Sequence, residues 1–493
     1  MRTTILVGVV MLFCGCPNTG GPDSGTGGGG FGGGIASGGG FASGGGSATG
    51  GGTATGGGTA TGGGTSTGGG TATGGGGGST GAGLFTVDTF AFYRPRLISD
   101  GAGVLHLVFN TNTSPSTVQY GRCAADCGTL ANWTFVTLAT DQFTGSTRLV
   151  AGSDNRLHLL FEITRTSGPN ELIYATCGSN CTTAASWTKT NLASLFNNAW
   201  NSPTWGAPLV IDSQNRLSFT VDQKIYLNGG VAMATCASNC STLSNWTVGT
   251  ISATGTNTAL AATGTTLHQI IDNAPGSGNA NRLAYRTCTA NCLQASSWQE
   301  LMGFYFVYDG AQPLAFSANA QGGLRLAYNQ GASDPSEPPA VRAQDHKMLQ
   351  WGCDGNCLQS ASWSGFVTGA VDDGKSGLSM VSLGEASGLA VSNGGSIVTR
   401  ICTGSCLVEA NWQAGELDTV TALSAEMNPF TYAQDSCAGS TVVNASWTLG
   451  QGAIAVKPDG TLAFAHTTSM LRTCASSTAV VYLPGFGRIV YLP

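Results

Sequence analysis

The sequence predicts an all-β chain, a seven-bladed β-propeller with four-stranded antiparallel blades, placed after a disordered Gly/Ser/Thr-rich tether. Two internal repeats and the composition support this fold class. A Cys-x3-Cys-x5-Trp unit occurs six times, and a turn followed by an alternating apolar strand occurs seven times. Gly contributes 76 of 493 residues and only 9% are charged, which excludes a helical bundle. Seven units of four short strands are typical of a propeller, because radial closure protects the sheet edges.

The first element in chain order, residues 1–15, is predicted to be a lipoprotein signal peptide. Its apolar stretch Thr4–Phe13 is too short for a bilayer span, which needs roughly 20 residues. The small Gly15 before Cys16 resembles a bacterial lipobox, which implies that Cys16 is lipidated and becomes the mature N-terminus. Pro17 is not the Asp that retains such proteins at the inner membrane, so we expect an outer-membrane lipoprotein, facing the cell surface or the periplasm. An ordinary secretory signal is the alternative.

The next element, residues 16–83, is the lipidated N-terminus followed by a flexible linker. It consists almost entirely of Gly, Ser, Thr and Ala, with "TATGGG" recurring, and it offers nothing to bury. A random coil of this length reaches roughly 45 Å on average. We therefore expect a spacer that holds the domain of residues 84–493 away from the lipid surface.

The cysteine repeat is interpreted as a set of hairpin disulfides. In an exported domain, two cysteines four positions apart close a tight turn, whereas a metal site requires about four converging ligands. The pairs lie some 50 residues apart with no His beside them, so we expect neither metal nor cofactor. The predicted bonds are Cys123–Cys127, Cys177–Cys181, Cys236–Cys240, Cys288–Cys292, Cys353–Cys357, Cys402–Cys406 and, between the two remaining cysteines, Cys437–Cys474. The Trp after each pair is expected to pack over the turn and against the adjoining blade.

The strand repeat defines the blades. Its Leu recurs at Leu105, Leu157, Leu217, Leu267, Leu324, Leu389 and Leu462. Each unit offers one strand before the turn, the repeated strand, one strand entering the Cys pair and one leaving from the Trp. The segment Leu84–Asp88 resembles the strands that leave each Trp, so it is expected to complete the last blade and close the ring. An eighth, degenerate blade and a parallel solenoid remain as alternatives.

The turn that ends in a strand-starting Trp resembles the Asp-box of sialidase-like propellers, Ser-x-Asp-x-Gly-x-x-Trp, with a disulfide in place of the Asp hairpin. The resemblance covers residues 85–493 as architecture. In that family three arginines bind the substrate carboxylate, and a Tyr–Glu pair and an Asp carry out the chemistry. The segment "FYRPRL" resembles the family's Phe/Tyr-Arg-Ile-Pro motif, which implies that Arg94 is one of the three arginines. The other members of this catalytic set have no counterpart that the motif identifies.

The candidate binding face carries the loops between the second and third strands. A polar residue recurs there five positions after the repeated Leu, and turn chemistry is the alternative explanation of that pattern. These polar residues are Asn110, Glu162, Asp222, Asp272 and Asn329, with Asn393 one position early. Loops on the same face carry Tyr93, Arg94, Arg96, Trp200, Trp205, Tyr305, Tyr308 and Asp309. The residues predicted to bind ligand are Arg94, Arg96, Glu162, Trp200, Trp205, Asp222 and Asp272.

Three histidines share one mid-strand position in different blades. His106, His158 and His268 each follow the repeated Leu directly. Spread over separate blades, they are not expected to converge on one metal, and we predict hydrogen bonds between blades for them.

Charge and composition restrict the function. The formal net charge is −6 and no run of Lys or Arg occurs, so nucleic acid is not an expected partner. Exposed aromatics beside amides and carboxylates suit a carbohydrate or a protein ligand. The sequence predicts a surface-anchored, non-catalytic binding module for glycan or protein, held at the membrane by its lipid. A glycoside hydrolase or lyase on a propeller scaffold is the alternative, and it requires two carboxyl groups about 5–9.5 Å apart.

Overall fold

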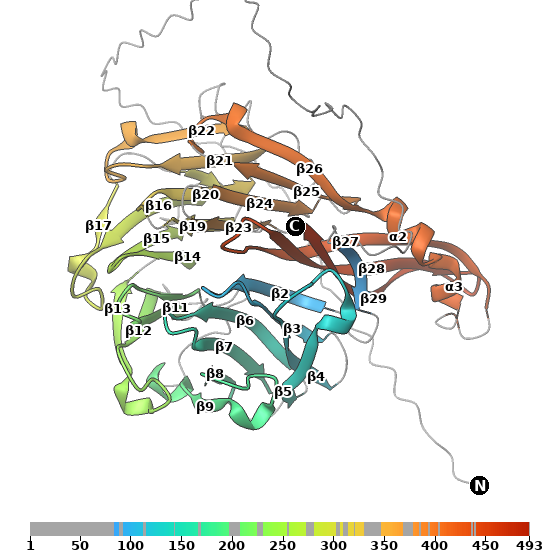
Figure 1. The fold of residues 1–493 in the computed structure, drawn as a ribbon, viewed down its shortest axis with the longest axis horizontal. Coiled ribbons are helices and arrows are strands. Elements are labelled where there is room, and N and C mark those ends of the chain that lie inside the picture. Colours follow the sequence, from blue (N-terminus) through green and yellow to red (C-terminus); the bar gives the residue numbers. More distant parts are fainter. Residues whose placement is uncertain are drawn as a thin grey trace, which may run out of the picture. The chain divides into compact units, whose positions relative to one another are not determined.

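Short apolar runs between Gly, Asn and Asp turns form the strands of seven β-sheets. The computed structural model describes residues 83–492 except 88–91, 112–114, 142, 166–168, 197–207, 224–229, 254–255, 273–280, 302–305, 309–313, 320, 330–346, 368–377, 384–385, 393–394, 403–404, 435–436 and 438–439. The sheets are antiparallel and follow one another around a ring (Figure 1). This confirms the predicted seven-bladed propeller of four-stranded blades. Within these residues, no helix is long and apolar enough to cross a membrane.

Blades 1 to 3 follow the same order from the inner to the outer strand. Blade 1 consists of β2 (Phe92–Ser99), β3 (Leu105–Thr111), β4 (Ser116–Cys123) and β5 (Thr134–Asp141). Blade 2 consists of β6 (Phe143–Ala151), β7 (Leu157–Thr164), β8 (Glu171–Cys177) and β9 (Thr188–Asn191), followed by the 3-10 helix η3 (Ala193–Phe196). Blade 3 consists of β10 (Leu209–Ile211), β11 (Leu217–Gln223), β12 (Gly230–Cys236) and β13 (Thr247–Ser252).

Blades 4 to 6 repeat this order with small departures. Blade 4 consists of β14 (Thr256–Thr263), β15 (Thr266–Asp272), β16 (Asn281–Cys288) and β17 (Gln299–Glu300), and β18 (Phe306–Tyr308) also pairs with β16. Blade 5 consists of β19 (Leu314–Ala318), β20 (Leu324–Asn329), β21 (Met348–Cys353) and β22 (Trp363–Val367). Blade 6 consists of β23 (Leu378–Leu383), β24 (Ala386–Ser392), β25 (Ser396–Cys402) and β26 (Trp412–Thr419).

Blade 7 joins the two ends of the described chain. Its strands are β27 (Val442–Val456), β28 (Leu462–Cys474), β29 (Ser477–Leu492) and, as the outer strand, β1 (Gly83–Val87). The blue β1 therefore pairs antiparallel with the red β29 (Figure 1). This confirms that the segment at Leu84 closes the ring.

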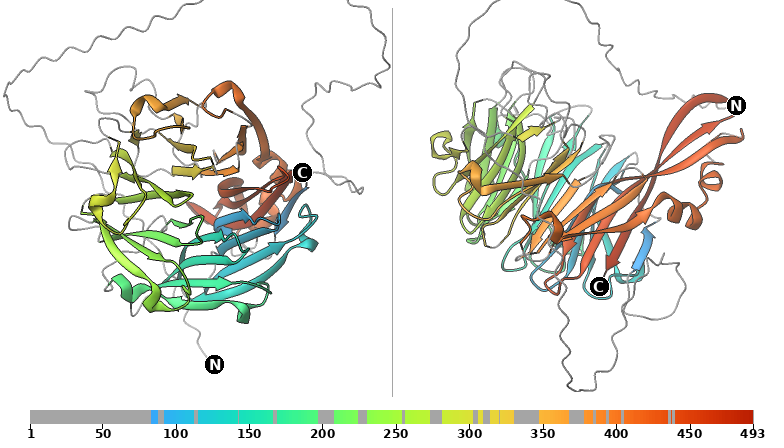
Figure 2. Two further views of the ribbon diagram at one scale, coloured as in Figure 1. Left: turned by 60° about the vertical axis from the view of Figure 1, so that its left-hand side comes forward. Right: turned by 90° about the horizontal axis from the view of Figure 1, so that it is seen from above.

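Long strands and two helices extend blade 7 beyond the other blades (Figure 2). The helices α2 (Val420–Glu426) and α3 (Pro429–Gln434) precede β27, and the disulfide Cys437–Cys474 joins the segment after α3 to the end of β28. Trp447 lies in the inner strand β27, where its indole donates to the carbonyl of Met427 at 2.8 Å. The degenerate seventh unit therefore builds this extension instead of another Cys-Trp turn.

A buried charge network fastens the closing strand. The guanidinium of Arg488, in β29, donates to Asp418 at 2.7 Å, to Glu426 at 2.7 Å and to the hydroxyl of Thr86 at 2.8 Å. His466 lies 2.9 Å from the same Asp418 carboxylate. Hydrogen bonds from His466 and the charges of both neighbours keep the pKa of Asp418 below its ordinary value, although burial opposes them. The first strand, the last two strands and blade 6 are thus joined by one set of polar contacts.

The hydrophobic core lies between the blades. Seven clusters of buried side chains occur within the described residues, and each takes its members from two adjacent blades, including blades 7 and 1. The second strands are buried on both faces, as the pattern of β3 shows, because each is covered by a neighbouring blade on either side. Closing the ring is therefore what completes the core.

The seven predicted disulfides are all present. In blades 1 to 6 each C-x3-C turn leads into a short 3-10 helix and then into the Trp. These helices are η1 (Leu130–Asn132), η2 (Ala184–Ser186), η4 (Leu243–Asn245), η5 (Ala295–Ser297), η6 (Ser360–Ser362) and η7 (Glu409–Asn411). Each indole is 5–9% exposed, and it donates to the carbonyl of the second Cys at 2.8–3.1 Å. The Trp residues are core, as predicted.

A local rule explains the residue before the second Cys. Four of these positions have a left-handed backbone, with φ between 49° and 55°, and Asn and Asp tolerate this conformation better than other non-glycine residues. The four residues are Asp126, Asn180, Asn239 and Asn291. The Asn and Asp of the repeat therefore shape the turn.

Candidate functional site

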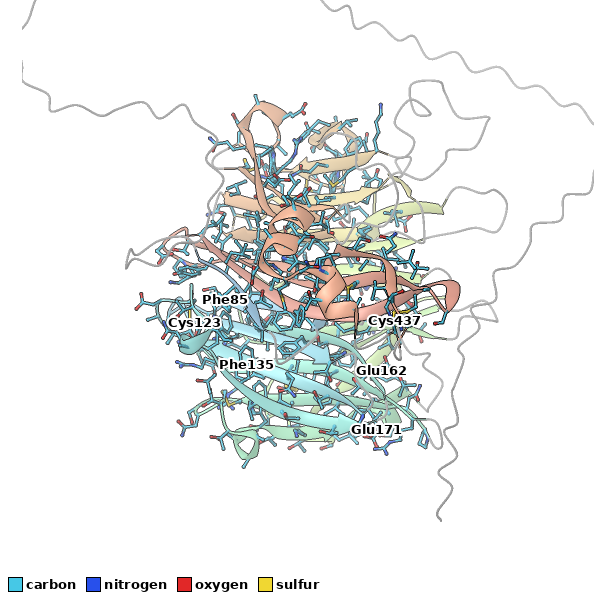
Figure 3. All side chains as sticks on the ribbon, turned by 90° about the vertical axis from the view of Figure 1, so that its right-hand side faces the viewer. Phe85, Cys123, Phe135, Glu162, Glu171 and Cys437 are labelled. Atoms are coloured by element: carbon cyan, nitrogen blue, oxygen red, sulfur yellow. A yellow bond between two sulfur atoms is a disulfide. The ribbon has the colours of Figure 1, made fainter. Side chains whose placement is uncertain are left out.

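The propeller has two distinct faces. The Cys-Trp turns and the turns between the first and second strands lie at one, which we call the Cys-turn face. The connections between second and third strands and between blades lie at the other, the loop face. Figure 3 shows Cys123 at one end of the strands, and Glu162, Glu171 and Cys437 toward the opposite end. The blade-7 disulfide at Cys437 and the predicted ligand residue Glu162 therefore belong to the loop face.

An irregularity in the inner strand of blade 1 shapes this face. Tyr93 pairs with Asn110 and Arg96 pairs with Val108, so two residues of β2 bulge out opposite one residue of β3. Arg94 lies in this bulge with a φ of 52°, a left-handed conformation that costs a non-glycine residue about 1–3 kcal/mol. The following Pro95 makes the conformation more unusual, because a residue before proline favours an extended backbone. Such strain is concentrated at functional sites.

Blade 2 repeats the bulge and supplies another arginine. In β6, Thr144 pairs with Ile163 and Thr147 pairs with Phe161, so the ladder is interrupted at the corresponding place. Arg148 then occupies the position of Arg96, nine residues before the repeated Leu. In the other five blades the residue nine positions before the repeated Leu is Pro208, Thr258, Ala315, Met380 and Ala453, in that order. The two arginines are therefore special to blades 1 and 2.

The arginines of blades 1 and 2 lie close enough for their positive charges to repel one another. Burial lowers the pKa of Arg96 to about 10, and the charge of Arg94 adds to the effect. Burial also lowers the pKa of Arg148 well below its ordinary value, with further contributions from Arg96 and Arg94. Both Arg96 and Arg148 are nevertheless partly exposed by accessible surface. We call Arg94, Arg96 and Arg148 the arginine cluster.

Hydrogen bonds join residues of the arginine cluster to backbone carbonyl groups. Arg148 donates to the carbonyl of Thr147 at 2.9 Å, and the Thr147 hydroxyl donates to the carbonyl of Arg94 at 3.4 Å, which links the two blades. Among the described residues, the guanidinium of Arg96 makes one hydrogen bond, to the carbonyl of Pro95 at 3.4 Å. Since a guanidinium has five N–H donors, Arg96 retains donors for a ligand.

An exposed aromatic ring adjoins the cluster. Tyr93 is 39% exposed, and the guanidinium carbon of Arg94 lies 4.9 Å from the centre of its ring. A cation over an aromatic face contributes about 0.5–1 kcal/mol at exposed sites. The pair presents a planar apolar surface beside positive charge, an arrangement suited to an anionic ligand that also has an apolar face.

The other predicted ligand residues are distributed differently. Glu162 lies inside β7 and is 2% exposed, and Asn110 lies inside β3 and is fully buried. Asp222 is half-buried near the end of β11. Asp272 and Asn329 lie at the ends of β15 and β20, and Tyr308 at the end of β18, with side chains outside the described part. Trp200, Trp205, Tyr305, Asp309 and Asn393 lie outside the described residues.

The structure thus brings Arg94 and Arg96 together, and it adds Arg148, which the sequence analysis missed. A usable signal was present, because Arg96 and Arg148 precede their repeated Leu by the same nine positions. The arginine side chains are all the more prominent because Lys and Arg together number only 20 in the whole chain.

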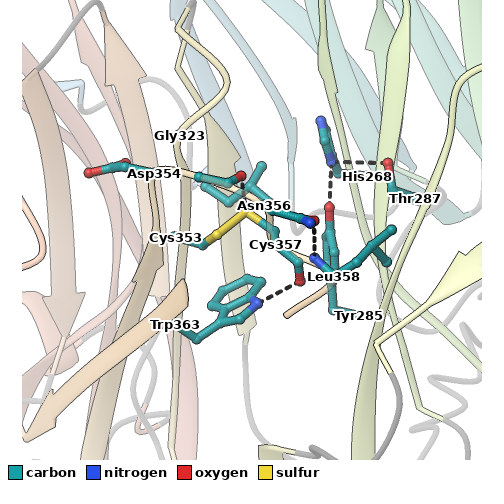
Figure 4. Close-up of a disulfide and its surroundings, with 12 residues drawn as sticks. His268, Tyr285, Thr287, Gly323, Cys353, Asp354, Asn356, Cys357, Leu358 and Trp363 are labelled. Atoms are coloured by element: carbon teal, nitrogen blue, oxygen red, sulfur yellow. Dashed lines mark hydrogen bonds between the residues drawn. A yellow bond between two sulfur atoms is a disulfide. The ribbon is translucent and has the colours of Figure 1, made fainter. Parts of the chain in front are cut away.

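The histidines form a different contact from the one expected. The hydrogen bonds lie within a blade, not between blades: His106, His158 and His268 each contact a Tyr hydroxyl of the neighbouring strand at 2.7–2.8 Å. The register explains this, because a Tyr two positions from the directly paired residue lies on the same face of the sheet. It is the Tyr ring that reaches the next blade, as Tyr285 contacts Trp363 edge-on with centroids 5.3 Å apart (Figure 4). Within the described residues, no group of three His, Cys, Asp or Glu side chains could hold a metal ion.

Comparison with known proteins yields structural likeness alone. No family model and no curated protein matches the chain. A lectin from Aleuria aurantia in complex with Fucα1-6GlcNAc is 11% identical with a TM-score of 0.43, covering 66% of this chain and 96% of the lectin. The polysaccharide lyase Uly1 is 10% identical with a TM-score of 0.44, covering 80% and 89%. The NanB sialidase of Streptococcus pneumoniae is 10% identical with a TM-score of 0.40, covering 84% and 70%.

These structures include a lectin, a lyase and a sialidase. Identities near 10% and TM-scores below 0.5 give no evidence of a shared activity. The seven-bladed fold rests on the strand pairing described above.

Proposed function

We propose that the domain is a non-catalytic binding module for an acidic glycan, and that the arginine cluster on the loop face receives the glycan's anionic group. The observation that carries the proposal is the gathering of Arg94, Arg96 and Arg148 at the adjoining bulges of blades 1 and 2, where burial and, to a smaller extent, mutual repulsion lower the pKa of Arg96 and Arg148. An anion placed among them would relieve that repulsion. Guanidinium groups bind carboxylates and sulfates through paired N–H donors, with about twice the strength of neutral hydrogen bonds.

A glycan is favoured over other anions by the surroundings. Tyr93 gives the cluster an exposed ring on which a sugar face can stack. The net charge of −6 and the absence of basic runs disfavour a nucleic acid, whose phosphates are bound by many distributed cations. The cluster is local, which suits a single acidic substituent on an otherwise uncharged ligand.

Binding is favoured over hydrolysis by the burial of Glu162, the acid opposite the blade-2 bulge. Hydrolysis of a glycosidic bond requires two carboxyl groups that reach the substrate about 5–9.5 Å apart. Glu162 lies opposite the β6 bulge and is 2% exposed, so it does not face an incoming substrate. A propeller hydrolase or lyase is therefore the second candidate, and product formation is the outcome that would favour it.

The proposed location follows from the N-terminus. Lipid on Cys16 and the linker of residues 16–83 would place this propeller at the outer membrane, where polymeric glycans are within reach of a tethered domain.

A glycan array tests the proposal. Full-length protein in detergent should bind sialylated, uronate-containing or sulfated glycans and leave their neutral counterparts at background. Arg96→Met should weaken this binding at least tenfold, whereas Arg165→Met, on the loop face of blade 2 and paired with Asp141 and Glu171, should leave it unchanged. Trp200→Ala with Trp205→Ala should also weaken it at least tenfold, about 1.4 kcal/mol, if the blade 2–3 loop takes part.

Two results would overturn the proposal. Equal binding of neutral and acidic glycans would remove the role of the cluster. Release of shortened or unsaturated sugar products during incubation would replace the binding module with an enzyme.

A further inference from the structure

A cavity lies on the Cys-turn face, opposite the arginine cluster, between blades 1 and 2. Its volume is about 330 Å³, at the lower end of the range for small-molecule sites. Blade 1 contributes Asp100, His106, Tyr120 and Arg122, and the turns of blade 2 contribute Asn155 and the cysteine loop around Asn180. These side chains belong to the Cys-turn face, so the cavity is separate from the arginine cluster.

The blade-1 wall is a rigid set of polar groups. One carboxylate oxygen of Asp100 accepts from the backbone N–H groups of Ala102 and Val104 at 2.9 Å each, and the other lies 3.1 Å from Nε2 of His106. Nδ1 of His106 lies 2.7 Å from the Tyr120 hydroxyl. Burial lowers the pKa of His106, so the ring is neutral near pH 7. The tautomer that suits both partners donates from Nε2 to Asp100 and accepts at Nδ1 from Tyr120.

Arg122 stands beside this wall, and no described residue is a partner of its guanidinium. Its side chain is half-buried and lines the cavity, and its charge acts on both His106 and Tyr120. No hydrogen bond or ion pair joins its guanidinium to any residue in the described part of the chain. The five N–H donors of the guanidinium are therefore available to a ligand.

At the corresponding positions of blades 2 and 4, the polar side chains form hydrogen bonds within the protein. Thr176 in blade 2 and Thr287 in blade 4 replace Arg122, and each hydroxyl donates to a backbone carbonyl at 3.0 Å. In blade 4 the hydroxyl of Thr263 takes the place of Asp100 and contacts Nε2 of His268 at 2.6 Å. Figure 4 shows this interface, where His268, Tyr285 and Thr287 form a closed set beside the cysteine turn of blade 5. In blade 1 the same His–Tyr pair lies beside the carboxylate of Asp100 and the guanidinium of Arg122, which has no partner in the described part of the chain.

The adjoining turns explain why the cavity is open. Between blades 2 and 3, Oδ1 of Asn215 accepts from the backbone N–H and the hydroxyl of Ser153 at 3.0 Å each, which ties the two turns together. Between blades 1 and 2 the corresponding residues are Asn155 and Gly101, and the glycine has no hydroxyl to offer. The exposed carboxamide of Asn155 thus faces the cavity with both donor and acceptor.

We propose that this cavity binds one uncharged sugar residue, independently of the acidic site on the loop face. Asp100 and Arg122 both line it, so a ligand with either net charge would meet a like charge. Asp100 and Asn155 supply acceptors and Arg122 and Asn155 supply donors, a mixture that matches sugar hydroxyls because each hydroxyl both donates and accepts. The volume suits a single pyranose ring with its substituents.

NMR titration with small sugars, in which both the sugar signals and the protein's imidazole signals are observed, tests this inference. The probes are the methyl glycosides of glucose, galactose, mannose and fucose, with glucuronic acid and glucosamine as charged counterparts. At least one neutral glycoside should bind with a Kd of about 1 mM and shift the imidazole signals of His106. Arg122→Met should weaken that binding at least tenfold and should fold normally, since Arg122 has no partner to lose in the described part. Thr287→Val, at the corresponding position of blade 4, should leave the binding unchanged.

Three results would overturn the inference. The first is that no neutral glycoside binds at concentrations up to about 10 mM, ten times the expected Kd. The second is binding that Arg122→Met does not weaken, and the third is a charged counterpart that shifts the His106 signals with an affinity equal to that of the neutral glycoside. None of these outcomes bears on the acidic site, because the His106 signals and Arg122→Met report on the cavity, whereas the glycan array relies on Arg96→Met.

Discussion

Acid should destabilise this propeller through two buried histidines. His158 and His268 are each 8% exposed, and each accepts a hydrogen bond from the hydroxyl of a buried Tyr in the tautomer that suits its partners. Burial lowers the pKa of both residues from 6.5 to about 4. Protonation would place an uncompensated charge between two blades, so the folded protein resists it.

The sign and size follow from the difference between the folded and unfolded states. Between pH 6.5 and pH 4 the unfolded chain takes up protons that the folded chain does not, so the free energy of unfolding falls as the pH falls. One pKa unit corresponds to about 1.4 kcal/mol. At pH 5 each His therefore lowers the free energy of unfolding by about 2 kcal/mol, and the pair lowers it by about 4 kcal/mol. At pH 4 the loss rises to about 3 kcal/mol for each His. Above pH 7 the contribution is fully present.

Urea unfolding at pH 7 and pH 5, followed by Trp fluorescence, measures this loss. The double variant His158→Gln and His268→Gln retains a neutral partner for each Tyr and removes the titration. Wild type should lose about 4 kcal/mol more than the variant between the two pH values. Equal losses in both proteins, or imidazole NMR titrations with pKa values near 6.5, would refute the reasoning.

Three further predictions concern the disulfides, the lipid anchor and the ion pairs of Arg488. Replacing Cys437 and Cys474 by Ala should cost about 4 kcal/mol of unfolding free energy, against about 2 kcal/mol for the blade-4 pair, because the closed loop is longer; equal costs in urea unfolding would contradict this. Cys16→Ala should abolish lipid labelling and release the protein from membranes, and a variant that still labels would disprove the anchor. Arg488→Met should cost about 3–5 kcal/mol of unfolding free energy because it leaves the buried carboxylate of Asp418 without its arginine, while Arg165→Met, at an exposed pair, should cost less than about 1 kcal/mol; similar melting temperatures for the two variants would exclude a role of the network in ring closure.

The repeats explain how much of the fold was predictable. The fixed spacing of Cys and Trp located the third and fourth strands of blades 1 to 6, and the repeated Leu located the second strand of all seven. Closure by the segment at Leu84 followed from its likeness to a strand that leaves a Trp. The extension of blade 7 was not predictable, because its unit has lost the second Cys and its Trp447 lies in an inner strand instead of an outer one.

The site was less accessible to sequence reasoning. The inner strands share no motif, so Arg148 had no pattern to mark it until β2 and β6 were aligned by their bulges. The His–Tyr contacts depend on strand register, which a single sequence shows only after the third strand has been placed. The cavity at Asp100 and Arg122 depends on residues that interrupt the repeat, whereas repetition was the signal that the sequence analysis followed.

Calorimetric titration with a matched pair of glycans tests the central claim most directly. The pair consists of one acidic glycan that the array identifies and the same glycan with its carboxylate converted to an amide, measured against wild type and Arg96→Met. The arginine cluster predicts that wild type binds the acid at least tenfold more tightly than the amide, about 1.4 kcal/mol, and that Arg96→Met removes most of this preference. Equal affinity of wild type for acid and amide, or a preference that survives in Arg96→Met, would contradict an anion site at the cluster.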